Sequence, residues 1–407
     1  MITVTDIFHS ERLYDMENEI IKKYGYKKAA YFDIETTGFS SKSQQIYMIG
    51  AAYKNEDGTF TMIQWFDDTT KDESKMLLMF REFLKDFDVL IHFNGNTFDV
   101  PFVLNRALKH GIHFNFDKLI LIDVYKDIKK YKNFFKTPDL KQKSIEAFLG
   151  VFREDQYNGG QLIEVYKEFI NLKENDASKN SLCSLLMLHN HDDMMGLVNI
   201  CDIYAYTDIF EGRFKTETIA LTEDSLMIGC KLESALKNPI FDMYNYTMCG
   251  KGSKKRRANE NIIVPRSGSD IIKYEAHGNM FKILIPVIEM ELKYFYENYK
   301  DYYYLPDEDT AIHKSVAQFV DKNHRKKATK ENCYIKKSGK FVPQTDNIFQ
   351  PTFKINHNDN LMFFEVNNDI IAHIIQDEDT YHHLSKKNTS CSLMDTYVKE
   401  LFCGMYL

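Results

Sequence analysis

The first half of the chain alternates short apolar runs with stretches of helical periodicity. Three apolar runs rich in β-branched and aromatic residues come first, at 29–35, 45–53 and 60–66, and polar connections such as Asn55–Gly58 separate them. These runs predict a three-stranded antiparallel meander. An apolar stripe over 73–87 then recurs with the spacing of a helix, so this segment is expected to be helical.

Strands and helices are expected to alternate after the meander. Residues 89–93 and 119–122 are apolar enough for buried strands, and a helical pattern over about 98–110 lies between them. Further helical patterns cover, in order, 140–149, 161–171, 177–188 and 192–210. A meander followed by alternating strands and helices predicts an α/β fold, a mixed sheet flanked by helices.

The second half of the chain has a different pattern. Alternating apolar runs at 271–275 and 280–288 flank His277-Gly-Asn279, which is typical of a hairpin turn. We therefore expect an α+β or β-rich domain in this half. The predicted organisation is an N-terminal lead-in over 1–24, the α/β domain over 25–212 and a C-terminal accessory domain over 213–407.

Composition restricts the class of protein further. With 407 residues, 44% of them hydrophobic, the chain can bury a large core in two or three domains. The formal net charge of −7 argues against coating nucleic acid through bulk positive charge. Seven scattered cysteines without a Cys-x-x-Cys motif fit a reducing compartment and give no zinc signature. Neither a signal segment nor an uncharged apolar stretch of membrane-spanning length is evident, so a cytoplasmic location is expected.

Two carboxylates stand where the first apolar run ends. Asp33 and Glu35 are two residues apart, so they lie on one face of the predicted strand, and Thr36-Thr37-Gly38 breaks the strand directly afterwards. Like charges held this close repel unless a cation binds them. Carboxylate oxygens suit Mg²⁺ or Mn²⁺, which proteins commonly hold together with substrate phosphates. For the pair taken alone, an exposed strand end with two solvated acids is the simpler explanation.

Two later segments add acids at the ends of predicted elements. Asp99 follows a buried strand and the turn at Asn94-Gly95, and it falls in the first turn of the next helix, where an acid can also simply start the helix. His189 and Asp193 are four residues apart and share a face if a helix begins there.

In this order and on these elements, the segments Asp33-Ile-Glu35, Asn94-Gly-Asn-Thr-Phe-Asp99 and His189-Asn-His-Asp-Asp193 resemble those of the DEDD 3′–5′ exonucleases of ribonuclease H-like fold. They look most similar to the bacterial YprB-type exonuclease domain. The resemblance covers about residues 25–212.

The resemblance implies phosphodiester hydrolysis with two divalent cations, Mg²⁺ or Mn²⁺, as cofactors. Their ligands would be Asp33, Glu35, Asp99 and Asp193, whose charges balance those of two dications. His189 is the candidate general base, because an imidazole can take a proton from water near neutral pH. The family places a tyrosine four residues, or a histidine five residues, before the last aspartate. His189 stands at the tyrosine spacing, so it could orient water, act as the base or contact phosphate.

Neighbouring residues leave alternatives open at this site. His191 competes with His189 for the role of base, and Asp192 would replace Asp193 if the helix were rotated. Asp123 ends the apolar strand 119–122, where it could support the site or cap a helix. By analogy with the family, the 3′-terminal nucleotide would be held by Thr36, Thr37, Gly38 and Asn94, although Asn94 is also a natural turn residue.

Basic and aromatic residues gather locally in the second half. They could hold single-stranded nucleic acid near the site, the tyrosines by stacking on unpaired bases. Solvated loops and a buried aromatic core are the simpler explanation. The basic residues are Lys254, Lys255, Arg256, Arg257, Arg325, Lys326 and Lys327, and the aromatic residues are Tyr302, Tyr303, Tyr304, Tyr334 and Phe341.

The sequence therefore predicts a metal-dependent 3′–5′ exonuclease that acts on DNA or RNA, with single strands or 3′ ends as its substrate. The C-terminal domain would guide the substrate or recruit a protein partner, and no membrane is involved. Two alternatives are a non-catalytic nucleic-acid-binding or scaffold protein that keeps the fold, and a structure-specific endonuclease with the same metals.

Overall fold

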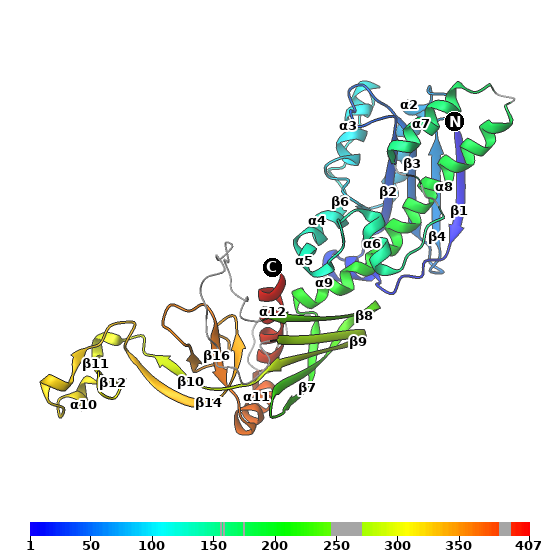
Figure 1. Ribbon diagram of the computed structural model, residues 1–407. Coiled ribbons are helices and arrows are strands. Elements are labelled where there is room, and N and C mark those ends of the chain that lie inside the picture. Colours follow the sequence, from blue (N-terminus) through cyan, green and yellow to red (C-terminus); the bar gives the residue numbers. More distant parts are fainter. Residues whose placement is uncertain (155–156, 158, 174–175, 246–270, 382–391) are drawn as a thin grey trace. The chain divides into compact units, whose positions relative to one another are not determined.

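The computed structural model describes residues 1–154, 157, 159–173, 176–245, 271–381 and 392–407 (Figure 1). The chain forms two compact units, Met1–Tyr206 and Thr207–Leu407. The predicted basic run Lys254–Arg257 lies outside the described residues. Within the described ranges, no helix is both long enough and apolar enough to cross a lipid bilayer.

A mixed sheet organises the first unit, as the pattern of apolar runs predicts. Its described strands lie in the order β1 (Ile2–Phe8), β4 (Phe60–Phe66), β3 (Ile46–Lys54), β2 (Ala29–Thr36), β5 (Val89–His92) and β6 (Ile120–Asp123). The pairs from β1 to β2 are antiparallel, whereas β2, β5 and β6 run parallel. The lead-in expected over 1–24 thus contributes an edge strand, β1, which is mostly exposed and lacks a strong apolar pattern.

Helices cover both faces of this sheet (Figure 1). On one face, Met76 and Phe80 of α2 and Val103 of α3 pack into a core with Phe32 of β2. On the other face, Tyr47 of β3 stacks on Tyr166 of α7, with ring centroids 4.1 Å apart. The helices are α1 (Met16–Tyr24), α2 (Glu73–Phe83), α3 (Asp99–Lys109), α4 (Val124–Ile128), α5 (Lys132–Phe135), α6 (Gln142–Leu149), α7 (Gly159–Asn171), α8 (Ala177–Asn199) and α9 (Ile203–Glu211).

The helix boundaries predicted over 177–210 are wrong, and the expected helix 192–210 is divided between α8 and α9. The polar run His189–Asp193 does not start a helix but lies inside α8, which continues without a break from Ala177 to Asn199. His189 and Asn190 are buried polar residues on this helix, so the apolar stripe is interrupted although the helix is not. The predicted sharing of one helix face by His189 and Asp193 holds, since the two are four residues apart in α8.

The second unit is rich in β-structure, as predicted. Where the structure describes it, its sheets follow the orders β7-β8-β9, β10-β14-β16-β15 and β12-β11-β13. The strands are β7 (Phe214–Leu221), β8 (Ser225–Asn245), β9 (Ile271–Pro286), β10 (Ile288–Phe295), β11 (Tyr302–Leu305), β12 (Thr310–His313), β13 (Lys326–Lys327), β14 (Tyr334–Gln344), β15 (Thr352–Phe353) and β16 (Met362–Glu365). The helices are α10 (Lys314–Ala317), α11 (Asn368–Tyr381) and α12 (Leu393–Tyr406).

The hairpin expected around His277-Gly-Asn279 is not formed. Residues 271–286 make one strand, β9, which pairs with the long strand β8. Gly278 has a φ of +56° and sits where the register between β8 and β9 shifts. A glycine that resembled a turn signal therefore accommodates an irregularity in the strand pairing.

Candidate active site

The end of β2 presents two carboxylates toward α8. Phe32 and Ile34 point into the core on the α2 and α3 side, so the alternating residues Asp33 and Glu35 point to the opposite face. The pairing with β3 shifts register between Glu35 and Thr36. Such irregularities end regular pairing and re-aim side chains, and here the shift lies directly beside the two acids.

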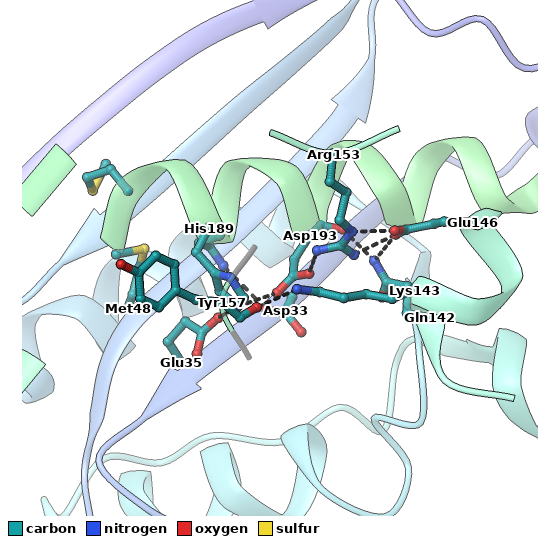
Figure 2. A network of polar contacts seen from close by, with 12 residues as sticks. Asp33, Glu35, Met48, Gln142, Lys143, Glu146, Arg153, Tyr157, His189 and Asp193 are labelled. Carbon is teal, nitrogen blue, oxygen red and sulfur yellow. Dashed lines mark hydrogen bonds and ion pairs between the residues drawn. The ribbon is translucent and has the colours of Figure 1, made fainter. Parts of the chain in front are cut away.

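Helix α8 brings a histidine and a third carboxylate to this strand end (Figure 2). The Nε2 atom of His189 lies 3.0 Å from Oδ2 of Asp193 and 3.4 Å from Oε1 of Glu35. Ligand atoms of Glu35, His189 and Asp193 all lie within 4.8 Å of one another. Two segments more than 150 residues apart in the chain thus meet in one cluster of possible metal ligands.

Asp99, the first residue of α3, completes the acidic group. Its side chain is buried, and it interacts electrostatically with Asp33, Glu35 and Asp193. Burial, followed by the charges of Asp99, Asp193 and Glu35, raises the pKa of Asp33 well above its ordinary value. Burial raises the pKa of Asp99 to about 7, although backbone N–H groups of Asp99 and Ile34 oppose the shift. The four acids are therefore close enough to disfavour one another's ionisation.

The pKa of Glu35 is raised as well, and two neighbouring side chains partly oppose this shift. Burial raises its pKa to about 8, and the neighbouring charges of Asp193 and Asp99 act in the same direction. His189 opposes this shift, as does the Tyr47 hydroxyl, which donates to Oε2 of Glu35 at 3.4 Å. Closely spaced oxygen donors that share surplus negative charge are the set that Mg²⁺ or Mn²⁺ binds. The residues present therefore fit divalent cations.

We expect the gain in thermal stability on adding Mg²⁺ to grow as the pH rises from 6 to 8.5. The folded-state pKa values of Asp99 and Glu35, about 7 and about 8, exceed the ordinary values of 3.8 and 4.5. Raised pKa values mean that the folded, metal-free protein binds protons more tightly than the unfolded chain. Its stability therefore falls as pH rises through this window, while protons compete less with the cation. Melting curves with EDTA or Mg²⁺ at each pH measure this, and a pH-independent shift would contradict it.

An arginine that the sequence did not single out binds the fourth acid. Arg153 forms ion pairs with Asp193 and with buried Glu146, whose Oε1 lies 2.5 Å from a guanidinium nitrogen (Figure 2). Burial alone would raise the pKa of Asp193, but the hydrogen bond from His189 and the charge of Arg153 hold it below its ordinary value. A lone arginine after a helix belongs to no motif, so only the tertiary structure identifies it.

Close packing of α6 against α8 sets the position of Glu146. A Cβ atom on Gly196 would lie 2.0 Å from Oε1 of Glu146, so the glycine makes room for the carboxylate. The side-chain nitrogen of Gln142 donates to the same oxygen and to the backbone carbonyl of Asp193, each at 2.9 Å. Asp193 is thus anchored through both its side chain and its backbone.

The alternatives to His189 and Asp193 make their contacts elsewhere. His191 pairs with Asp6 through Nε2 at 3.4 Å and with Asp192 through Nδ1 at 3.6 Å. Asp192 accepts a hydrogen bond from the backbone N–H of Glu154 at 3.0 Å. Neither contact involves Glu35 or Asp33, so α8 has the rotation that favours His189 and Asp193.

Asp123 takes both roles that the sequence left open. It caps α4 by accepting from the N–H of Lys126, and it accepts backbone N–H bonds from Asn94 and Asn96 at 2.9 and 3.2 Å. Asn94 has a φ of +60°, a conformation that suits its place in the turn. Asp123 therefore fixes the loop that leads to Asp99.

The predicted nucleotide-binding residues after β2 form a hydrogen-bonded loop. The Thr36 hydroxyl donates to the carbonyl of Gly38 at 3.0 Å, and that of Thr37 donates to Oε1 of Gln44 at 2.9 Å. The backbone N–H of Thr37 donates to the carbonyl of Gln45. These contacts hold the loop beside Glu35, and binding of a nucleotide by this loop stays a prediction.

The basic residues predicted to bind substrate differ in their exposure. Arg325 lies over the ring of Tyr303, 5.0 Å from its centroid, and donates to the carbonyl of Ala317. Lys326 and Lys327 are exposed. Of the predicted stacking residues, Tyr334 and Phe341 are buried and cannot reach a base, and Tyr302 stacks on Tyr296.

Comparison with family models supports the fold of the first unit. A family model described as the RNase_H superfamily matches residues 30–205. Among solved structures, the chain is similar to the family B DNA polymerase from the hyperthermophilic archaeon Pyrobaculum calidifontis, with 20% identity and a TM-score of 0.34. That similarity covers 46% of this chain and 25% of the polymerase chain. No curated protein matches the sequence.

The family match and the sheet agree. The matched range begins at the second residue of β2 and extends through α8, so it includes all four acids, Asp33 and Glu35 on β2, Asp99 on α3 and Asp193 on α8. The more specific YprB type stays a prediction. Residues 30–205 form a ribonuclease H-like domain.

Proposed function

We propose that this protein is a metal-dependent 3′–5′ exonuclease that hydrolyses phosphodiester bonds of DNA or RNA. The observation that carries the proposal is the convergence of Asp33, Glu35, Asp99 and Asp193 beside His189, in a fold whose superfamily includes nucleases. The four carboxylates would bind two divalent cations, Mg²⁺ or Mn²⁺. When bound, such cations stabilise charge on the attacking and leaving oxygens of a phosphodiester.

The protein's own groups would position the reactants. His189 directs Nε2 toward the carboxylates of Glu35 and Asp193, so a water bound between these carboxylates would lie within reach of its imidazole. It would orient this water or accept its proton. The loop from Thr36 to Gly38 and the turn at Asn94 lie at the ends of neighbouring strands, β2 and β5, where they would hold the 3′-terminal nucleotide.

Linear and circular single strands test the reaction class. With Mg²⁺ or Mn²⁺, the protein is expected to release mononucleotides from a linear strand and to leave a closed circle intact, because an exonuclease needs an end. EDTA should abolish the release. Cleavage of the circle would indicate an endonuclease instead. Metal-independent binding without hydrolysis of either strand would favour the nucleic-acid-binding or scaffold alternative.

The exposed lysines of β13 are proposed to contact the nucleic acid backbone. We expect Lys326→Gln/Lys327→Gln to weaken binding of single strands and to flatten its salt dependence. Losing two phosphate contacts should change the slope of log K against log salt by up to about 1.4. Fluorescence anisotropy across a salt series measures this slope.

A matched control comes from the same unit. Lys215 and Lys231 are exposed partners on β7 and β8, so Lys215→Gln/Lys231→Gln removes the same charge elsewhere. If both double variants change the slope equally, or neither does, the role assigned to Lys326 and Lys327 is wrong.

A further inference from the structure

Three neighbouring strands and α8 hold a row of buried polar contacts that ends at Asp33. In the sheet, Gly50 of β3 lies directly between Asp33 of β2 and Gln64 of β4. Asn190 of α8 contacts the side chains on both sides of this glycine. Asn190 is fully buried and Gln64 is 4% exposed. Buried amides at such positions need defined partners.

A backbone carbonyl fixes the direction of every hydrogen bond in this row. One end of the Gln64 amide lies 2.9 Å from the carbonyl oxygen of Met187. A carbonyl only accepts, so this end must be the nitrogen, Nε2. The same nitrogen lies 3.0 Å from Asn190, which must therefore present its oxygen, Oδ1. The other end of the Asn190 amide, Nδ2, is left to donate to Oδ2 of Asp33 at 3.3 Å.

Gly50 provides the space in which Asn190 lies. A Cβ atom at position 50 would come within 2.5 Å of Oδ1 of Asn190 and within 2.8 Å of Cγ of Met194. Real Cβ atoms do not approach other atoms so closely, so any larger residue would displace the Asn190 side chain. The glycine therefore lets α8 approach β3 closely enough for one amide to connect Gln64 with Asp33.

We propose that Asn190 and Gln64 are positioning residues that orient the Asp33 carboxylate for metal binding. The inference rests on the proposed function. Asn190 donates to one oxygen of Asp33 and leaves the other free for a cation. The Asn190 amide orients the carboxylate through a hydrogen bond and adds no positive charge beside Asp33. Gln64 keeps the Asn190 amide from turning its oxygen toward Asp33, where two acceptors would repel.

Two variants that leave both Asp33 and Asn190 in the sequence test this role. Gln64→Leu removes the donor that orients Asn190, and Gly50→Ala displaces Asn190 without removing a polar group. Each is expected to weaken Mn²⁺ binding by about 10- to 100-fold, the usual effect of losing a partner of a metal ligand. In turnover assays kcat should fall while KM for the nucleic acid is unchanged, a split that a general loss of structure would not produce.

Matched controls separate positioning from damage to the fold. Gly159→Ala adds the same methyl group where nothing lies within 4 Å. Thr61→Val removes a side-chain hydrogen bond to Asn55 from the same strand as Gln64. Both controls should bind Mn²⁺ as the wild type does, as judged by electron paramagnetic resonance of free Mn²⁺. Thermal melting identifies any variant that fails to fold. If Gly50→Ala fails to fold, Gln64→Leu alone tests the positioning role.

The outcomes distinguish this inference from the proposed function. Wild-type Mn²⁺ affinity and kcat in a folded Gln64→Leu protein would overturn the positioning role alone. A wild-type protein that binds no Mn²⁺ would overturn the proposed function, and the positioning role with it. Mn²⁺ binding that weakens in both variants but not in the controls would support the inference, even if the natural substrate of the wild type is still unidentified.

Discussion

Asp33→Asn is expected to lower the rate of phosphodiester hydrolysis at least about a thousand-fold, because cation stabilisation contributes several kcal/mol to the transition state and each 1.4 kcal/mol is tenfold in rate. Asp33 interacts with the charges of Asp99, Asp193 and Glu35, the three other acids of the group. Its removal should abolish productive metal binding. Initial rates on a labelled single strand, measured with saturating Mg²⁺ or Mn²⁺, test this expectation.

The same substitution should not unfold the protein. Burial and the neighbouring acids raise the pKa of Asp33, so ionised Asp33 opposes folding of the metal-free protein. A neutral asparagine removes this repulsion, and the melting temperature in EDTA at pH 8 should equal or exceed that of the wild type. Asp192→Asn serves as a control on α8 and is expected to keep most of the activity. Normal turnover by Asp33→Asn would refute the site.

Arg153→Met is expected to destabilise the protein by about 3–5 kcal/mol, the usual cost of removing one partner from a buried ion pair. The Glu146 side chain is 2% exposed and that of Arg153 is 8% exposed, so water cannot replace the lost guanidinium. Asp193 loses the same partner. Urea unfolding at pH 7.5 in EDTA measures the change in the free energy of unfolding.

The double variant Glu146→Gln/Arg153→Met controls for the cause of this loss. It removes the buried anion together with the cation, and replacing both members of a buried pair is often nearly neutral. Most of the stability should therefore return, although Asp193 would still lack Arg153. If Arg153→Met is as stable as the wild type, or if the double variant is no more stable than the single one, the ion pair does not have the assigned role.

Local patterns were sufficient to predict the strands from β2 to β6 and the position of Asp33 and Glu35 at the end of one of them. The strands from β2 to β6 are short apolar runs bounded by turn residues, and Asp33 and Glu35 stand where one of them ends. The edge strand β1 was missed because most of its residues are exposed, which leaves little apolar pattern to detect. Prediction from periodicity succeeds where one face of an element is buried against apolar neighbours.

Long-range polar contacts explain what the sequence could not reveal. The run His189–Asp193 has the composition of a helix start, yet contacts with the sheet allow these polar residues inside α8. Arg153, Gln64 and Gly50 belong to no local motif, since their partners lie elsewhere in the chain. The His277-Gly-Asn279 segment shows the same limit, because residues 271–286 pair with β8 as one strand and Gly278 accommodates a shift in the register.

Digestion of 5′-labelled single-stranded DNA and RNA with Mn²⁺, in parallel with Asp33→Asn, tests the central claim most directly. The account predicts a ladder of labelled products that shortens progressively from the 3′ end and is absent with the variant. The same gel shows which sugar is preferred. Immediate release of the labelled mononucleotide would contradict the polarity, and no cleavage of either strand by the metal-loaded wild type would contradict the proposed activity.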